Sequence, residues 1–142
     1  MSPFIGSQTC KVDNKGRITI PATFRRFLGT DGETLVVTKS GDPCLRLYTP
    51  EGWQAFQDKL NALPGGKEKK LVVRFFSLNS AILQVDKQGR VALPRDFMSE
   101  YGMGDEVQLL GTIENIEVWR PEDLRVQVKD APAALEKLEP LL

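Results

Sequence analysis

One stretch decides the fold of this chain: Cys10-Lys11-Val12-Asp13-Asn14-Lys15-Gly16-Arg17-Ile18-Thr19-Ile20-Pro21-Ala22-Thr23-Phe24. It returns as Leu83-Gln84-Val85-Asp86-Lys87-Gln88-Gly89-Arg90-Val91-Ala92-Leu93-Pro94-Arg95-Asp96-Phe97. Asp, Gly, Arg, Pro and Phe recur at a constant offset of 73 residues, as from Asp13 to Asp86, with aliphatic residues matched between them. After a two-residue slip, Leu45-Arg46-Leu47-Tyr48-Thr49-Pro50 matches Ile116-Glu117-Val118-Trp119-Arg120-Pro121. The chain is therefore an internal duplication.

Each copy has the pattern of a β-hairpin followed by a helix. Apolar residues alternate with polar ones up to Val12 and again after Arg17, which is typical of strands with one buried face. Between them, residues 13–16 form a turn, since Asp can cap the backbone and Gly permits a positive φ. Pro21 suits the first turn of a helix, and Gly29 is a suitable end for it. The second copy repeats this pattern.

Further strands are expected at about 34–39 and 44–48, and again at about 106–111 and 116–119. A unit of roughly 45 residues has too small an interior to fold alone. Two copies can bury each other's apolar faces about a pseudo-twofold axis. The predicted fold class is α+β, mainly β, with short helices.

The segment between the copies is predicted to be helical and packed on the core, with a break at Pro64-Gly65-Gly66. It carries apolar side chains that need burial: Trp53, Phe56, Leu71, Val72, Val73, Phe75 and Phe76. After Pro121 the pattern is weaker, and a short helix is expected over 133–138. The predicted organisation is a first repeat over 7–53, a helical connection over 54–79, a second repeat over 80–124 and a C-terminal tail over 125–142.

Composition excludes several classes of protein. No apolar run approaches the roughly 20 residues of a membrane-spanning helix, and the first residues do not resemble a secretion signal. We therefore expect a cytoplasmic protein with no membrane partner. Cys10 and Cys44 are the only cysteines, and histidine is absent, so the usual four-ligand zinc site and a Ser–His–Asp triad are both excluded. We expect buried thiols, no cofactor and no metal.

The net charge is zero, but it is unevenly distributed. Residues 1–73 carry eleven Lys and Arg against seven Asp and Glu, a net charge of +4. Residues 74–142 carry eight against twelve, a net charge of −4. Such a division indicates either a basic face that binds phosphates or a contact between the basic end of one chain and the acidic end of a neighbouring chain.

The two turns carry the candidate functional residues. Asp13 and Arg17 come close across the mouth of a tight hairpin, as do Asp86 and Arg90 in the second copy. An ion pair explains these residues in part, but it leaves other cations near the turns unexplained. Arginine can read guanine and lysine can hold phosphate, so the pattern also suits DNA. The candidate DNA-binding residues are Lys11, Asp13, Lys15, Arg17, Arg25, Lys87 and Arg90.

The sequence resembles the MraZ family in both motifs and in their spacing. The similarity extends over about residues 4–124 and includes Leu35-Val36-Val37-Thr38-Lys39, Cys44-Leu45-Arg46-Leu47-Tyr48, Arg74-Phe75-Phe76-Ser77 and Ile116-Glu117-Val118-Trp119. It implies an AbrB-like swapped-hairpin barrel. It also implies a nucleoid-associated bacterial regulator, usually a repressor, that assembles into closed homo-oligomeric rings. Such rings bind short tandem repeats in promoter DNA of division and cell-wall genes.

The resemblance places the binding motif on Asp13, Lys15 and Arg17, and on Asp86 and Arg90 in the second copy. The second copy has Lys87 and Gln88 where the first has Asn14 and Lys15, so its charge is placed differently. We therefore expect the first turn to read DNA, while the second has a more structural role.

Three alternatives remain. An enzyme could use Asp13 and Asp86 as an acid–base pair, but each has a local Arg that keeps it ionised, so we expect no enzyme. An AbrB-type antitoxin also binds DNA, but it has one copy per chain and a toxin-binding tail. A structural ring protein that does not bind DNA is the third.

Overall fold

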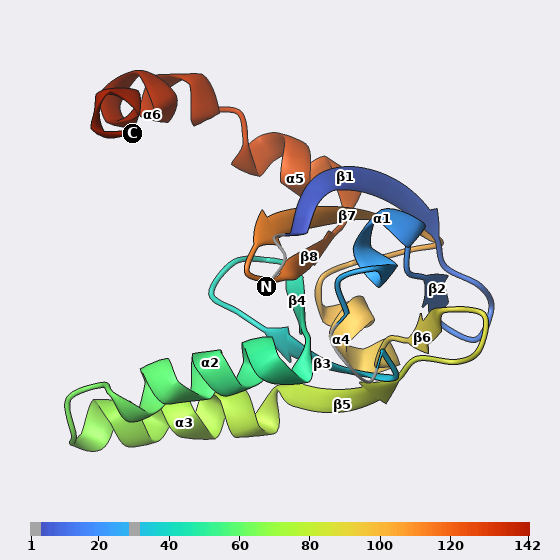
Figure 1. Ribbon diagram of the computed structural model, residues 1–142, viewed down its shortest axis with the longest axis horizontal. Helices are drawn as coiled ribbons and strands as arrows, with labels where there is room; N and C mark the ends of the chain where they lie inside the picture. The colour runs from blue at the N-terminus through green and yellow to red at the C-terminus, as the bar shows by residue number, and fades with distance from the viewer. Residues whose placement is uncertain (1–3, 29–31) are drawn as a thin grey trace.

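The strands form one six-stranded antiparallel sheet and one two-stranded ribbon (Figure 1). The computed structural model describes residues 4–28 and 32–142. The sheet has the order β1-β7-β8-β4-β3-β5, and the ribbon pairs β2 with β6. The strands are β1 (Phe4–Lys11), β2 (Arg17–Thr19), β3 (Thr34–Lys39), β4 (Leu45–Tyr48), β5 (Ser80–Gln84), β6 (Arg90–Ala92), β7 (Glu106–Ile113) and β8 (Ile116–Trp119). The predicted α+β, mainly β class is confirmed.

The two copies exchange strands. β1 of the first copy pairs with β7 of the second, and β5 of the second copy pairs with β3 of the first. The ribbon likewise takes one strand from each copy. Neither copy therefore has a complete sheet of its own, which is the swapped-hairpin arrangement that the family resemblance implies.

A pseudo-twofold axis relates the copies. In the ribbon, Ile18 lies opposite Val91, its own equivalent in the repeat. In the sheet, Arg46 lies opposite Glu117, which is again its equivalent. Exchanging the copies reverses the strand order and so reproduces the same sheet. The pair β4–β8 of the sheet and the pair β2–β6 of the ribbon therefore lie on the axis.

The ribbon covers the open side of the sheet. β2 lies beside β1 and β6 beside β5, so the ribbon approaches both edge strands. The alternating apolar residues of both copies meet in one core, in which Ile18 and Val91 are each 1% exposed. Cys10 and Cys44 are buried free thiols, as expected.

Each hairpin is followed by a short helix that closes the core. α1 (Ala22–Arg25) follows Pro21, and α4 (Arg95–Glu100) follows Pro94, whose fixed φ suits a helix start. Their apolar faces bury Phe24 and Phe97. Gly29, the expected helix end, lies outside the described residues.

The segment between the copies forms a helical hairpin of α2 (Pro50–Asn61) and α3 (Lys67–Leu78), which extends away from the sheet (Figure 1). At its base, Tyr48 packs against Trp53 and Phe56, and Phe56 packs against Phe76 of α3. The prediction that this segment is buried is wrong for a single chain, because neither helix contains a buried residue. Beyond its base, no described element outside the hairpin buries its side chains, and Leu71 is 54% exposed.

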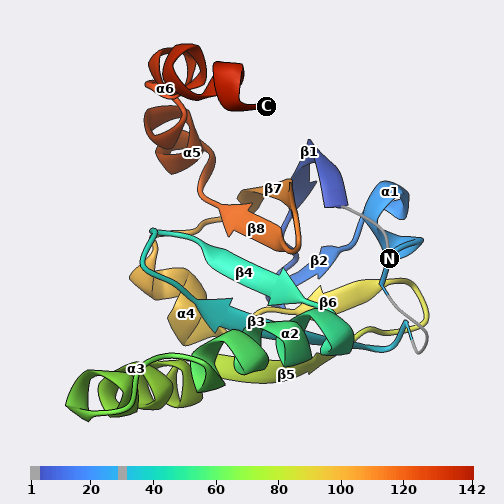
Figure 2. The same cartoon turned by 60° about the vertical axis from the view of Figure 1, so that its left-hand side comes forward.

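The C-terminal segment is also helical. It contains α5 (Pro121–Gln127), α6 (Ala131–Leu138) and a final 3₁₀ turn, Glu139–Leu141. Leu124 anchors α5 beside Trp119, while Leu135, Leu138 and Leu141 are exposed. Figure 2 shows the C-terminal helices and the helical hairpin on opposite sides of the sheet. Within the described ranges, no helix is long and apolar enough to cross a membrane.

Candidate nucleic-acid interface

The first turn, residues 13–17, is organised by the carboxylate of Asp13. Its Oδ1 accepts hydrogen bonds from the backbone amides of Lys15 (2.9 Å) and Arg17 (2.8 Å). Its Oδ2 accepts from Arg17 Nε at 2.7 Å. Gly16 has a φ of +78°, the conformation that the sequence predicted for this position. The carboxylate of Asp13 therefore fixes both the backbone of the turn and the position of Arg17 Nε.

These contacts act on the charge of Asp13. The backbone hydrogen bond from Arg17 is the largest cause lowering the pKa of Asp13 to about 2, and the side-chain contacts of Arg17 act in the same direction. A carboxylate that accepts several N–H groups resists protonation. Asp13 is therefore ionised at neutral pH and is not available as a general acid.

The second turn, residues 86–90, has the same frame. Asp86 accepts from the amides of Gln88 and Arg90 at 2.9 and 2.8 Å, and from Arg90 Nε at 2.8 Å. Its pKa is likewise lowered, with the backbone hydrogen bond from Arg90 as the largest cause. The difference lies at the tip, where Arg90 Nη2 donates to Gln88 Oε1 at 3.0 Å. Across residues 4–28 and 32–142, no equivalent side-chain bond holds Arg17 Nη1 or Nη2.

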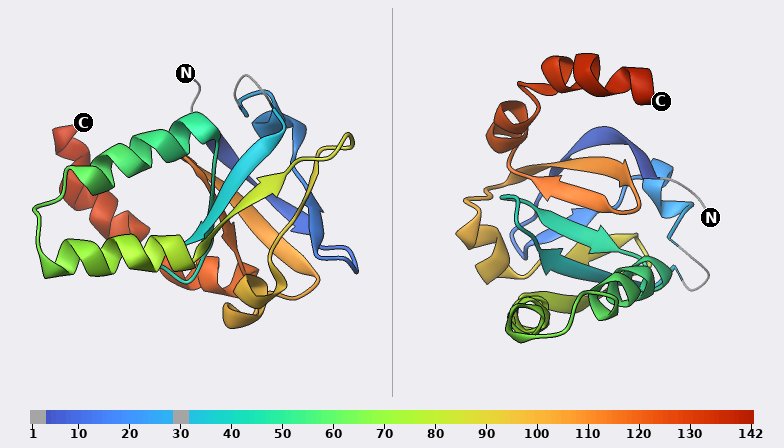
Figure 3. Two further views of the ribbon diagram at one scale, coloured as in Figure 1. Left: turned by 90° about the horizontal axis from the view of Figure 1, so that it is seen from below. Right: turned by 90° about the vertical axis from the view of Figure 1, so that its left-hand side faces the viewer.

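Both turns project from the same end of the molecule, opposite the helical hairpin. They lead into β2 and β6, whose antiparallel pairing places one turn at each end of the ribbon, and both turns point away from the helical hairpin (Figures 1 and 3). The side chains of Asp13 and Arg17 are about one-third exposed, as are those of Asp86 and Arg90. Lys15 and Lys87 are exposed at the tips. The motif residues of each turn are thus accessible.

The other predicted cations lie at different positions. Lys11 is exposed on β1 next to the first turn, opposite Glu106 in the strand register. Arg25 belongs to the first copy, yet its guanidinium lies against Gly89 of the second turn. Their roles in DNA binding remain predictions.

Two contacts near the turns were not predicted. Arg95 Nη2 of α4 donates to the carbonyl oxygen of Asn14 at 2.8 Å. Gln88 holds Arg90, as described above. The first contact joins residues 81 positions apart, so no local pattern could indicate it. Prediction of the contact between Gln88 and Arg90 would have required the rotamers of both side chains.

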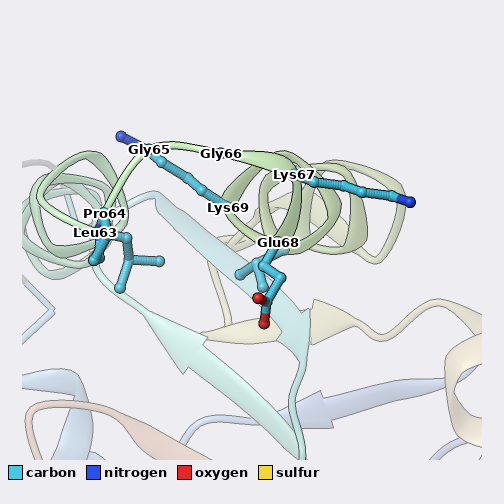
Figure 4. A pocket seen from close by; sticks show the side chains of 8 residues that line it. Leu63, Pro64, Gly65, Gly66, Lys67, Glu68 and Lys69 are labelled. Carbon is cyan, nitrogen blue, oxygen red and sulfur yellow. The ribbon is translucent and has the colours of Figure 1, made fainter.

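A hollow at the far end of the helical hairpin is not a competing site. It has a volume of about 490 Å³ and is lined by Leu63, Pro64, Gly65, Gly66, Lys67, Glu68, Lys69 and Val72. Figure 4 shows the ammonium groups of Lys67 and Lys69 extending away from each other. The part of the chain that the structure describes contains no group of three or more Cys, Asp or Glu side chains able to hold a metal.

The fold and the turns together define a class: duplicated swapped-hairpin proteins that present two Asp-x-x-Gly-Arg turns at one end. Comparison with known proteins specifies the family. The family model of the MraZ protein, described as antitoxin-like, matches residues 4–74 and again 78–137.

Curated relatives agree over most of their length. The chain is 39% identical to the "Transcriptional regulator MraZ" of Lachnoclostridium phytofermentans over 119 residues, which is 84% of this chain and 82% of the relative. It is 35% identical to the protein of the same name from Caldicellulosiruptor saccharolyticus, with coverage of 94% and 92%. For the protein of that name from Acetivibrio thermocellus the identity is 38%, with coverage of 82% and 80%. The chain belongs to the MraZ family.

Proposed function

We propose that the chain is a sequence-specific, DNA-binding transcriptional regulator without enzymatic activity. It acts in the cytoplasm at the nucleoid, where it binds short tandem repeats in promoters of division and cell-wall genes as a repressor. The observation that carries this proposal is the pair of rigid turns at one end of the fold, each with a fixed arginine and an exposed lysine. The relatives named as transcriptional regulators support it.

The first turn is the principal reader. Arg17 is held by Asp13 through Nε, and its two terminal nitrogens are the groups that would make a bidentate contact with a guanine. Lys15 at the tip, and Lys11 beside the turn, supply phosphate contacts. In the second turn Gln88 occupies Arg90 Nη2, so Arg90 and Lys87 contribute less to sequence recognition.

The first test compares Arg17→Ala with Arg90→Ala, which removes the matching ion pair from the second turn. Loss of one bidentate base contact costs about 1–3 kcal/mol, so specific affinity for a promoter repeat falls roughly five- to 150-fold in Arg17→Ala. Arg90→Ala is expected to lose less. Binding is measured by fluorescence anisotropy on specific and scrambled duplexes. Wild-type affinity in Arg17→Ala would remove Arg17 as a reader, and equal losses would remove the asymmetry.

We also propose that several identical chains assemble into a closed ring. The helical hairpin, residues 50–79, has five Lys and Arg against three Asp and Glu, and exposes Leu71, Val72, Val73 and Phe75. Residues 121–142 have three against five, and expose Val126, Leu135, Leu138 and Leu141. A contact between the helical hairpin of one chain and residues 121–142 of the next chain is heterologous. It closes into a ring when the rotation between neighbouring chains permits.

A ring would present many copies of the first turn to tandem repeats, so that several weak contacts act together. The test is the solution mass by light scattering at low and high salt. Apolar burial is expected to maintain the assembly at high salt, where surface charges are screened over about 3 Å at 1 M. A monomer of 15.9 kDa under both conditions would refute the ring.

A further inference from the structure

Each turn is bonded to the opposite copy of the repeat. The amide of Leu93, at the end of β6, donates to the carbonyl oxygen of Gly16 in the first turn at 3.0 Å. The amide of Ile20, at the end of β2, donates to the carbonyl oxygen of Gly89 in the second turn at 2.8 Å. These two bonds are equivalent under the pseudo-twofold. The backbone therefore ties each turn to the other half of the chain.

An arginine reinforces each of these ties. Arg95 follows Leu93 by two residues and donates from Nη2 to the Asn14 carbonyl oxygen at 2.8 Å. Arg25 donates from Nε to the Ile20 carbonyl oxygen at 3.1 Å, and its guanidinium covers Gly89 so closely that an added Cβ would lie 2.6 Å from Cζ. The first turn is thus braced by the second copy, and the second turn by the first copy.

The duplication does not account for these arginines. At the offset of 73 residues, Arg95 corresponds to Ala22, and Arg25 corresponds to Met98. The two copies have different residues at these places, yet each places a guanidinium against the opposite turn. The braces therefore arise from two unrelated positions, and each can be removed separately.

We propose that Arg95 is a positioning residue for DNA binding by the first turn, and that Arg25 has the same role for the second. The Asn14 carbonyl and the Lys15 amide belong to one peptide group. The bond from Arg95 to that carbonyl, together with the bond from the Lys15 amide to Asp13, fixes the plane of this peptide and so the direction of Lys15. Arg95 acts through the turn and not on phosphate. This inference rests on the proposed function for its DNA readout.

Hydrogen–deuterium exchange tests the brace without DNA. In Arg95→Ala, amides of residues 13–17 are expected to exchange at least about threefold faster, while those of residues 86–90 stay unchanged. Arg25→Ala is expected to give the reverse pattern. Arg26→Ala is the matched control, because the Arg26 guanidinium lies over the Phe27 ring and holds neither turn. Unchanged exchange of residues 13–17 in Arg95→Ala would overturn the proposal.

The salt dependence of DNA binding separates positioning from phosphate contact. Arg95→Ala is expected to weaken specific binding about three- to tenfold with an unchanged salt slope. Lys15→Ala lowers the slope by about 0.9 for its lost phosphate contact. Arg95→Lys keeps a donor and is expected to recover part of the affinity. A slope reduced as in Lys15→Ala would overturn the positioning role. Wild-type protein that fails to bind promoter DNA would refute the proposed function, and the exchange pattern would still decide the brace.

Discussion

Replacing Ile18 by alanine tests whether the two copies form one cooperative unit. Ile18 is 1% exposed and lies opposite Val91 on the pseudo-twofold axis. A cavity at this place is lined by both copies at once. We therefore expect Ile18→Ala to destabilise the whole chain in a single unfolding transition.

The magnitude follows from the burial of Ile18. Truncation of a buried isoleucine to alanine costs about 2–5 kcal/mol, and the near-complete burial of Ile18 places it at about 3 kcal/mol. With an unfolding entropy of about 2.1 cal/mol/K per residue, a chain of 142 residues loses about 3 °C in Tm per kcal/mol. The expected decrease is about 10 °C.

Urea and thermal unfolding, followed by circular dichroism and tryptophan fluorescence, measure this change. Circular dichroism reports on the whole backbone, and the fluorescence reports on two regions, because Trp119 is buried in β8 and Trp53 lies on the helical hairpin. Ile82→Ala is the control, since Ile82 is 72% exposed and its truncation is expected to cost less than about 0.5 kcal/mol. Two separate transitions, or a loss below about 1 kcal/mol in Ile18→Ala, would refute a shared core.

Gly111→Ala is expected to cost about 3 kcal/mol in chemical unfolding, because a Cβ there would lie 2.5 Å from the Phe4 backbone carbon, whereas Gly104→Ala meets nothing within 4 Å and serves as its control. Equal stability of these two alanine variants would disprove the close approach of β1 and β7. The pKa of Asp13, about 2, lies below its unfolded value, so its stabilising contribution is present above about pH 4 and is lost as the pH falls through 2. The stability difference between wild type and Asp13→Asn is expected to shrink between pH 4 and pH 2, and a constant difference would exclude this linkage.

The local parts of the fold could be predicted from sequence because their causes are local. Asp13 and Gly16 lie within one turn, and each imposes its geometry on immediate neighbours. The constant offset between copies also predicted a pseudo-twofold axis, because two similar halves can bury each other's apolar faces about it. The contact between Asp and Arg in each turn was predicted for the same reason.

The remaining features depend on contacts between distant residues. The bond from Arg95 to Asn14 requires the second copy to fold onto the first, and nothing near either residue indicates it. The exposed hairpin shows a different limit. The apolar residues of α3, such as Leu71, have the composition of a buried face, but composition does not specify whether the same chain or another copy covers it.

The centre of the sheet shows what duplication within one chain permits. In a symmetric pair of identical copies, a residue on the axis would face itself, and a charged residue there would be destabilised by its equivalent. Here Arg46 lies opposite Glu117 and forms an ion pair with it, with Nε 3.9 Å from Oε2, while Glu117 accepts a hydrogen bond from Trp119 Nε1 at 2.9 Å. The two copies can differ at this position only because they belong to one chain. The same freedom allows a basic and an acidic half, and it allows Lys15 in one turn where the other has Gln88. A ring built from such chains would have a direction, because each chain would contact one neighbouring chain through one surface and the other neighbouring chain through a different surface.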